Sequence, residues 1–145
     1  MKLYGMPGHL IRRLHQRSTH IFQERAKEVG VDLTSVQFAA MDALRTHPGI
    51  DQARVAALIA YDRATIGGVI ERLERKGLVE RSVSEQDRRA RVVQLTETGR
   101  ALLEEFTPTV STMQGEILAH LDESERAQFN ALLRKALDLD AEAAD

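Results

Sequence analysis

The 145-residue sequence contains no cysteine. This absence excludes disulfide bonds, thiolate metal ligands and a peroxide sensor built on a reactive cysteine. The chain also lacks the roughly 18 consecutive apolar residues that a membrane-spanning helix requires. Its opening, M-K-L-Y-G-M-P-G, has no long apolar stretch of the kind found in a secretory leader. We therefore expect a soluble protein that does not enter a membrane, and a cytoplasmic location fits this composition.

Common catalytic motifs are missing as well. The sequence has no G-x-S-x-G, no G-x-x-x-x-G-K-[ST] and no H-E-x-x-H. Carboxylates such as Glu104 and Glu105 are explained by the solvent face of a predicted helix. His9, His15 and His20 are spaced six and five residues apart, so they do not form the i, i+4 pair typical of a helical metal site. We expect neither an enzyme nor a bound cofactor, and a metal-responsive regulator remains an alternative only through ligation across two subunits.

What the sequence does contain is a tight pair of helical patterns followed by a predicted hairpin. The apolar spacing predicts helices over residues 51–60 and 62–76, separated by little more than Tyr61. Two alternating stretches follow and predict strands whose inward face carries Val79, Val83, Val93 and Leu95. This order is typical of a winged helix-turn-helix, in which the second helix of the pair reads the major groove of DNA.

The second helix has two different faces. Asp62 is expected to cap its first free N–H groups, and its apolar residues fall at i, i+3, i+4 and i+7, namely Ile66, Val69, Ile70 and Leu73. The opposite face carries Arg63, Thr65, Gly67, Gly68, Glu71, Arg72 and Arg75. Each glycine costs about 1 kcal/mol of helix propensity relative to alanine, so the adjacent pair predicts a close approach to DNA. Relief of crowding against a neighbouring helix is the alternative.

The predicted turn between the strands is rich in arginine. Gly77 is expected to end the helix in a left-handed conformation. The turn S-E-Q-D-R-R-A-R then places Arg88, Arg89 and Arg91 together, and guanidinium groups of this kind enter a narrow minor groove or bind phosphates. We expect Asp87 to hold one of them through a carboxylate pair. A solvated charged loop is the alternative, and its position directly after the predicted reading helix favours DNA.

Charge is distributed unevenly along the chain, although the net charge is only −2. Residues 63–91 contain eight basic and five acidic side chains, a net charge of +3. Residues 97–145 contain four basic and eleven acidic side chains, a net charge of −7. Such asymmetry directs a positive lobe toward DNA and keeps a negative lobe away from it.

The segment from Ile59 to Gly99 resembles the MarR family of bacterial transcriptional regulators. The resemblance is carried above all by D-R-A-T-I-G-G-V-I-E-R-L-E-R-K-G-L-V-E-R and by D-R-R-A-R-V-V-Q-L-T-E-T-G, and it extends over nearly the whole chain through the T-x-x-Q helix start at Thr34 and the terminal helices. It implies a homodimer with a winged helix-turn-helix in each subunit, and many members lose DNA affinity when a small phenolic or aromatic acid binds. It also implies a reading helix that carries Arg63, Thr65, Gly67, Gly68 and Arg72, and a wing tip that carries Arg88 and Arg89. The two glycines stand where many relatives have larger polar residues.

The terminal helices are predicted to form a dimerisation frame. We expect a single, mainly α domain with a small β-hairpin wing, in which residues of about 1–30 and 100–145 dimerise and residues of about 31–99 bind DNA. Thr96 and Asp122 are expected to be N-caps, with Glu125 completing a capping box. The apolar residues of the first helix and of the last are Leu10, Ile11, Leu14, Ile21 and Phe22, and Leu121, Phe129, Leu132, Leu133 and Leu137. A dimer would place two reading helices roughly 34 to 36 Å apart for a palindromic operator. The alternative is that these helices cover only the monomer's own core.

Candidate effector residues lie mainly in the first helix. His15 and Ser18 interrupt its apolar stripe, so we expect them in the seam between the dimerisation frame and the DNA-binding lobe. His9, Arg13 and His20 lie on another face and offer a cation to an aromatic acid. Phe38 and Met41 are expected to supply an apolar wall. For each of these residues, an ordinary core or surface role is the alternative. The opening P-G-H-L-I-R-R-L resembles regulators of aromatic or N-heteroaromatic acid catabolism.

These observations predict a homodimeric repressor that a small phenolic or N-heteroaromatic carboxylic acid releases from double-stranded DNA. We expect Arg63 and Thr65 to contact base edges, Arg72 a phosphate, and Arg88 and Arg89 the flanking minor groove. The effector is expected between the first, second and long fifth helices. The alternative from another class is a helical dimerisation or protein-interaction module that does not bind DNA.

Overall fold

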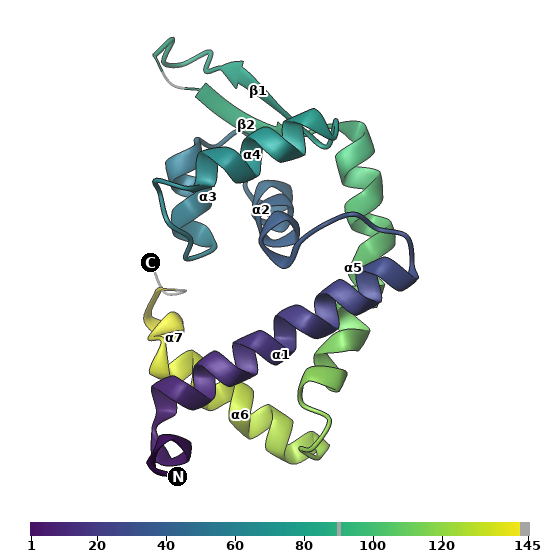
Figure 1. The fold of residues 1–145 in the computed structure, drawn as a ribbon. Coiled ribbons are helices and arrows are strands. Elements are labelled where there is room, and N and C mark those ends of the chain that lie inside the picture. The colour runs from purple at the N-terminus through teal and green to yellow at the C-terminus, as the bar shows by residue number, and fades with distance from the viewer. Residues whose placement is uncertain (90, 143–145) are drawn as a thin grey trace.

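The computed structural model describes residues 1–89 and 91–142. Its elements are η1 (Lys2–Gly5), α1 (Pro7–Glu28), α2 (Ser35–Thr46), α3 (Gln52–Leu58), α4 (Ile66–Arg75), β1 (Val79–Val83), β2 (Arg91–Leu95), α5 (Glu97–Ile117), α6 (Glu123–Ala136) and α7 (Leu139–Glu142). Figure 1 shows α2, α3, α4 and the hairpin grouped at one end, α1, α6 and α7 at the other, and α5 running between them. The predicted fold class, mainly helical with a small hairpin wing, is confirmed.

Local sequence signals fix where several elements begin and end. Thr34 and Asp122 each form a capping box, with Gln37 and Glu125 respectively. The Thr96 hydroxyl accepts a hydrogen bond from the Gly99 N–H and caps α5, as predicted. Gly77 has a φ of 74°, which is the left-handed conformation expected at the end of α4.

The hairpin is antiparallel, and its base is anchored to the body of the protein. Val79 pairs with Leu95, and Val83 pairs with Arg91 at the outer end. Val79, Val93 and Leu95 are buried as predicted, but the prediction for Val83 was wrong, because its side chain is 58% exposed. The hairpin extends beyond the body at that point, so the inward face has nothing to cover it. Closer to the body, the Val93 N–H donates to the Ile50 carbonyl at 2.7 Å.

One continuous core joins α1 and α5 to α2, α3, α4 and the hairpin. The four apolar residues of α4 are buried together with residues of α2 and the hairpin. Three aromatic rings connect α1, α2 and α5, with ring centroids 5.6 to 6.0 Å apart, namely Phe22, Phe38 and Phe106. The α1–α5 contact is strengthened by Arg25, whose Nε lies 2.8 Å from Glu116 Oε2. Hydrogen bonds to Glu28 and Glu116 hold the pKa of Arg25 above its ordinary value.

The terminal helices leave apolar side chains uncovered. Every residue of α6 is at least partly exposed, and Leu132 and Leu137 are each 64% exposed. Leu10 and Ile11 of α1 are exposed too, and α1 and α6 both line one cavity. Within the described residues, no helix combines the length and the apolar character needed to cross a bilayer.

We predict that Gly99→Ala destabilises the protein. A Cβ at position 99 would lie 2.0 Å from the Leu78 carbonyl oxygen, so either the start of α5 or the α4–β1 junction must move. Overpacking of this kind costs about 1 to 3 kcal/mol, and the urea midpoint should fall accordingly. Gly115→Ala is the matched control in the same helix, because its Cβ would meet only the tip of the Arg126 side chain at 3.4 Å. Equal midpoints for the two variants would contradict the prediction.

Candidate nucleic-acid interface

The turn between α3 and α4 is held by backbone and side-chain hydrogen bonds. Ala60 adopts a positive φ of 52°, and the Tyr61 N–H donates to the Ala56 carbonyl at 2.9 Å. Asp62 Oδ1 then accepts from the Ala64 N–H at 2.8 Å. An aspartate that bonds its own backbone two residues on stabilises a turn. The chain therefore turns once more before it becomes helical.

Because of this turn, the second helix begins later than the sequence predicted. α4 begins at Ile66 with Thr65 as its N-cap, four residues later than expected. The Asp62 carboxylate accepts a hydrogen bond from the Ala64 backbone N–H, so it stabilises the turn and is not the N-cap of α4. Arg63 and Thr65 consequently lie on the turn before α4, where both are exposed.

The faces of α4 are segregated as the spacing predicts. Ile66, Val69, Ile70 and Leu73 are buried, whereas Arg72 and Gly68 are exposed and Gly67 is half-buried. A Cβ at Gly68 would meet no described atom within 4 Å, and one at Gly67 would meet only Gln52 Nε2, at an ordinary 3.6 Å. An alanine side chain at either position would therefore not clash with the described chain. The open space in front of them is available to a partner molecule.

The wing tip presents its arginines to solvent. Arg88, Arg89 and Arg91 are all exposed, and none of them takes part in an ion pair among the described residues. The predicted pairing of Asp87 with an arginine side chain is wrong. Asp87 Oδ1 instead accepts from the Arg89 backbone N–H at 3.0 Å, so the carboxylate shapes the turn and leaves the guanidinium groups free. Residue 90 lies outside the described residues.

A hollow of about 370 Å³ separates the α3–α4 turn from the wing. Three guanidinium groups border it, those of Arg63, Arg81 and Arg91. Arg81 was not among the residues predicted to bind DNA. Its position two residues after the buried Val79 in a strand was the available signal, because alternate residues of a strand share a face. Arg81 is bonded to Glu74, and this hydrogen bond holds the pKa of the Glu74 carboxyl below its ordinary value, with a weaker contribution from Arg91.

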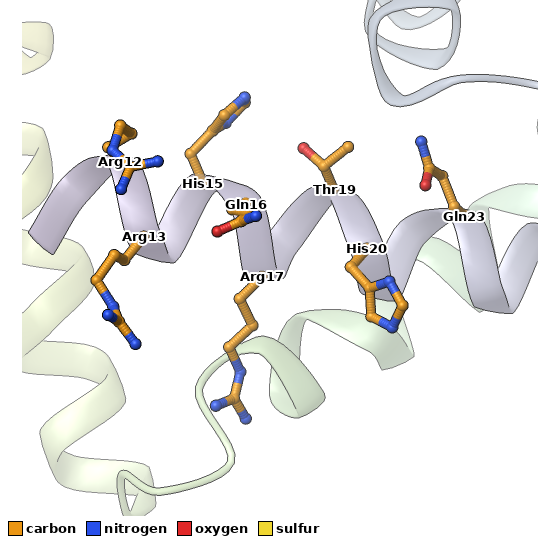
Figure 2. Close-up of a pocket in the computed structure, with 8 residues that line it drawn as sticks. All are labelled: Arg12, Arg13, His15, Gln16, Arg17, Thr19, His20 and Gln23. Carbon is orange, nitrogen blue, oxygen red and sulfur yellow. The ribbon is translucent and has the colours of Figure 1, made fainter. Parts of the chain in front are cut away.

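The candidate effector residues fall into separate groups. Figure 2 shows a polar strip along α1 in which Arg13 and Arg17 extend to one side and His15 and Thr19 to the other. These four residues help to line a hollow of about 770 Å³. Arg13 also lies over the Tyr4 ring, with Cζ 5.4 Å from the ring centroid.

His15 and Ser18 share a second cavity of about 930 Å³, formed by α1, α5 and α6. None of its described lining residues comes from α2, α3 or α4. The two residues therefore line one cavity, which lies within the frame of terminal helices and not in the predicted seam. His9 lines neither hollow, and its Nε2 is buried without a hydrogen-bond partner among the described residues.

Phe38 and Met41 line neither of the α1 hollows. Met41 is fully buried in the core, and Phe38 packs against the rings of Phe22 and Phe106. Their predicted place in an apolar effector wall is not what the structure shows, because both side chains are used in internal packing. In the described part of the chain, no group of three or more His, Cys, Asp or Glu residues is placed to hold a metal ion.

Comparison with known proteins gives consistent matches. The sequence model of the MarR family matches residues 33–90. The HTH-type transcriptional repressor NicR from Pseudomonas putida is 41% identical over 136 residues, which cover 94% of this chain and 85% of NicR. A structure of BpsR from Bordetella bronchiseptica, which describes how 6-hydroxynicotinic acid regulates DNA binding, superimposes with a TM-score of 0.84 at 38% identity and covers 92% of this chain and 94% of BpsR. The transcriptional repressor CouR, bound to a 23-mer DNA duplex, superimposes with a TM-score of 0.80 at 28% identity and covers 96% and 95% of the two chains.

Proposed function

This chain belongs to the MarR family of DNA-binding transcriptional regulators, and from that premise we propose that it is a homodimeric repressor released from a palindromic operator by a small aromatic carboxylic acid. Members of the family are transcriptional regulators rather than enzymes. One observation carries the DNA part of the proposal. Cationic side chains without ion-pair partners in the described chain stand on the α3–α4 turn, on α4 and on the wing, above a helix whose opposite face is buried.

The roles of these residues follow from their positions. Arg63 and Thr65, on the turn before α4, contact base edges in the major groove, and Arg72 binds a phosphate from the next turns of the helix. Gly67 and Gly68 let the backbone of α4 approach the DNA closely. Arg88 and Arg89 reach the flanking minor groove from the wing tip, and Arg91, at the outer end of β2, binds the DNA backbone. Guanidinium groups suit both tasks, because their planar donors match base edges and phosphate oxygens.

The terminal helices support the dimer. Soluble monomers rarely expose large contiguous apolar patches, yet Leu132 in α6, Leu137 just after it, and Leu10 and Ile11 in α1 are all exposed. A second copy of the chain covers these residues, so that residues of about 1–30 and 100–145 form the interface and about 31–99 the DNA-binding lobe. The two copies of α4 then lie roughly 34 to 36 Å apart, one turn of DNA.

The effector proposal rests on the charge of α1. The chain has no acidic residue before Glu24, and Arg12, Arg13 and Arg17 lie along α1 with His15 and His20. A carboxylate is the natural partner of such a strip. We place the acid in the hollow that Arg13 and His15 both line, whereas Ser18 lines the adjoining cavity and His9 lies close to the N-terminal end of α1. The regulation of BpsR by an N-heteroaromatic acid supports this class of effector.

Release of DNA requires a path from α1 to α4, and Lys76 offers one. Its Nζ donates to the Asp32 carbonyl in the α1–α2 loop at 2.6 Å and to Gln37 Oε1 at 3.3 Å. Because Lys76 follows the last turn of α4, a shift of α1 that moves this loop also moves α4. An acid that binds better to the shifted arrangement lowers the population that fits the operator.

We predict that Arg89→Ala weakens operator binding by about 1 to 3 kcal/mol while the protein remains dimeric. Fluorescence anisotropy across a salt series and light scattering measure the two properties. Lys27→Ala removes an equal charge in the last turn of α1 and serves as the control. If Arg89→Ala changes binding to no DNA sequence, the wing has no part in the mechanism and the protein-interaction alternative gains support.

Gly68→Ala is expected to separate stability from function. Alanine meets no described atom there, and replacing a helical glycine by alanine stabilises a helix by roughly 0.5 to 1 kcal/mol. The melting temperature should rise while operator affinity falls, because the added methyl group separates α4 from the DNA. Unchanged affinity in the more stable variant would refute the close approach.

A panel of acids tests the effector class. We expect 6-hydroxynicotinic acid or a related aromatic acid to release the operator duplex, and nicotinamide, which lacks the carboxylate, to have no effect. Arg13→Gln should raise the acid concentration needed for half release about tenfold, since a charge-assisted hydrogen bond is lost, whereas Lys27→Gln should not. If nicotinamide releases the operator duplex as well as the acid does, the cations of α1 take no part in effector binding.

A further inference from the structure

We propose that Arg81 is a positioning residue that sets the wing against α3 and α4, and that operator recognition by the wing-tip arginines depends on it. The proposal rests on the DNA-binding function proposed above. It adds a residue whose contribution is made through the geometry of the protein and not through a contact with DNA.

Arg81 occupies an unusual place for a charged residue. It lies in β1 opposite Val93 in β2 and two residues after Val79. Both valines are buried, so Arg81 lies on the inward face of the hairpin, and its side chain is only 25% exposed. A strand position of this kind would ordinarily hold an apolar residue. The guanidinium group is therefore directed at the helices and not at solvent.

Its donors join three elements of the DNA-binding lobe. Nη1 donates to Gln52 Oε1 in α3 at 3.0 Å. Nη2 donates to Glu74 Oε1 in α4 at 3.2 Å, and Nε donates to Glu74 Oε2 at 3.4 Å. Two parallel donors on one carboxylate fix the direction of the guanidinium plane as well as its distance. β1 is thereby held to α3 and to α4 through one side chain.

The wing needs such a support because it has only two strands. An isolated two-stranded hairpin is marginally stable in water. β2 is anchored to the body by the Val93 N–H, which donates to the Ile50 carbonyl at 2.7 Å. On β1, Arg81 provides the corresponding contact with the helices. Without it the hairpin can twist about β2, and a small rotation at the base displaces the tip, where Arg88 and Arg89 lie.

A direct phosphate contact is the competing role for Arg81, because it borders the same hollow as Arg63 and Arg91. A phosphate there would have to compete with the Glu74 carboxylate, which already accepts two of the guanidinium donors. The two roles give opposite effects when the charge of Glu74 is removed. If Arg81 binds a phosphate and Glu74 competes with that phosphate for the guanidinium group, neutralising Glu74 tightens DNA binding. If Glu74 holds the wing in place, its neutralisation weakens binding.

Glu74→Gln is therefore the test variant, and Glu71→Gln is its matched control. Glu71 lies one turn earlier on α4, is exposed, and has no ion-pair partner among the described residues. The probes are a duplex that the wild-type protein selects from a randomised library and a scrambled duplex of equal length. We expect Glu74→Gln to bind the selected duplex about fivefold more weakly. Glu71→Gln should bind it equally or about twofold more tightly, because a negative charge near the phosphates is gone.

Two further measurements separate positioning from general damage to the fold. Base substitutions in the selected duplex should show that Glu74→Gln loses discrimination at the flanking positions under the wing while it keeps discrimination at the positions read by α4. Arg81→Lys, which keeps the charge and loses the fork, should show the same pattern with a melting temperature close to wild type.

Tighter or unchanged binding by Glu74→Gln would overturn the proposal, as would equal loss of discrimination at every base position. If the wild-type protein selects no sequence, the proposed DNA-binding function fails as a whole. If the wild-type protein is selective and Glu74→Gln binds like Glu71→Gln, the positioning role of Arg81 fails while the DNA-binding function stands.

Discussion

The packing of one face of α4 against α2 and the hairpin positions every candidate DNA contact in this protein. Ile70 and Leu73 are fully buried there, and burial of an aliphatic side chain of this size contributes about 1.5 to 3 kcal/mol. Since this face is fixed, the opposite side of α4 must point away from the body. The two glycines and Arg72 lie on that side, and Arg72 has no ion-pair partner among the described residues. The α3–α4 turn and the wing flank this helix and extend the same surface.

Charge complements this packing. A chain with a net charge of −2 has no general attraction to nucleic acid, so its affinity must come from local surfaces. The arginines of the turn, α4 and the wing tip are free of ion pairs within the described residues, whereas Arg25 and Arg81 are paired with carboxylates and tie elements together. Arginines paired with carboxylates therefore hold elements of the fold together, whereas those without ion pairs in the described chain are available to DNA. The acidic C-terminal part lies on the helices that the dimer proposal places away from DNA.

Features that depend on neighbours in the sequence were predictable. The Asp122–Glu125 capping box, the Thr96 N-cap and the left-handed Gly77 each follow from residues a few positions apart. The late start of α4 was missed, because the Asp62 carboxylate can cap either a helix or a turn. Val83 was misplaced because alternation does not reveal where the body under a strand ends. Arg81 was overlooked because its partners lie 7 and 29 residues away. Met41 was assigned to an effector wall because an apolar helix face does not itself show which neighbour covers it.

Sequence-selective DNA binding by the purified wild-type protein is the most direct test of these conclusions. Fluorescence anisotropy would compare the intergenic duplex upstream of the protein's own gene with a scrambled duplex over a range of salt concentrations. We predict tight binding to the first duplex, weak binding to the second, and an affinity that falls linearly with salt on logarithmic axes as phosphate contacts are screened. Equally weak binding to both duplexes at every salt concentration would contradict the repressor function and leave only the fold.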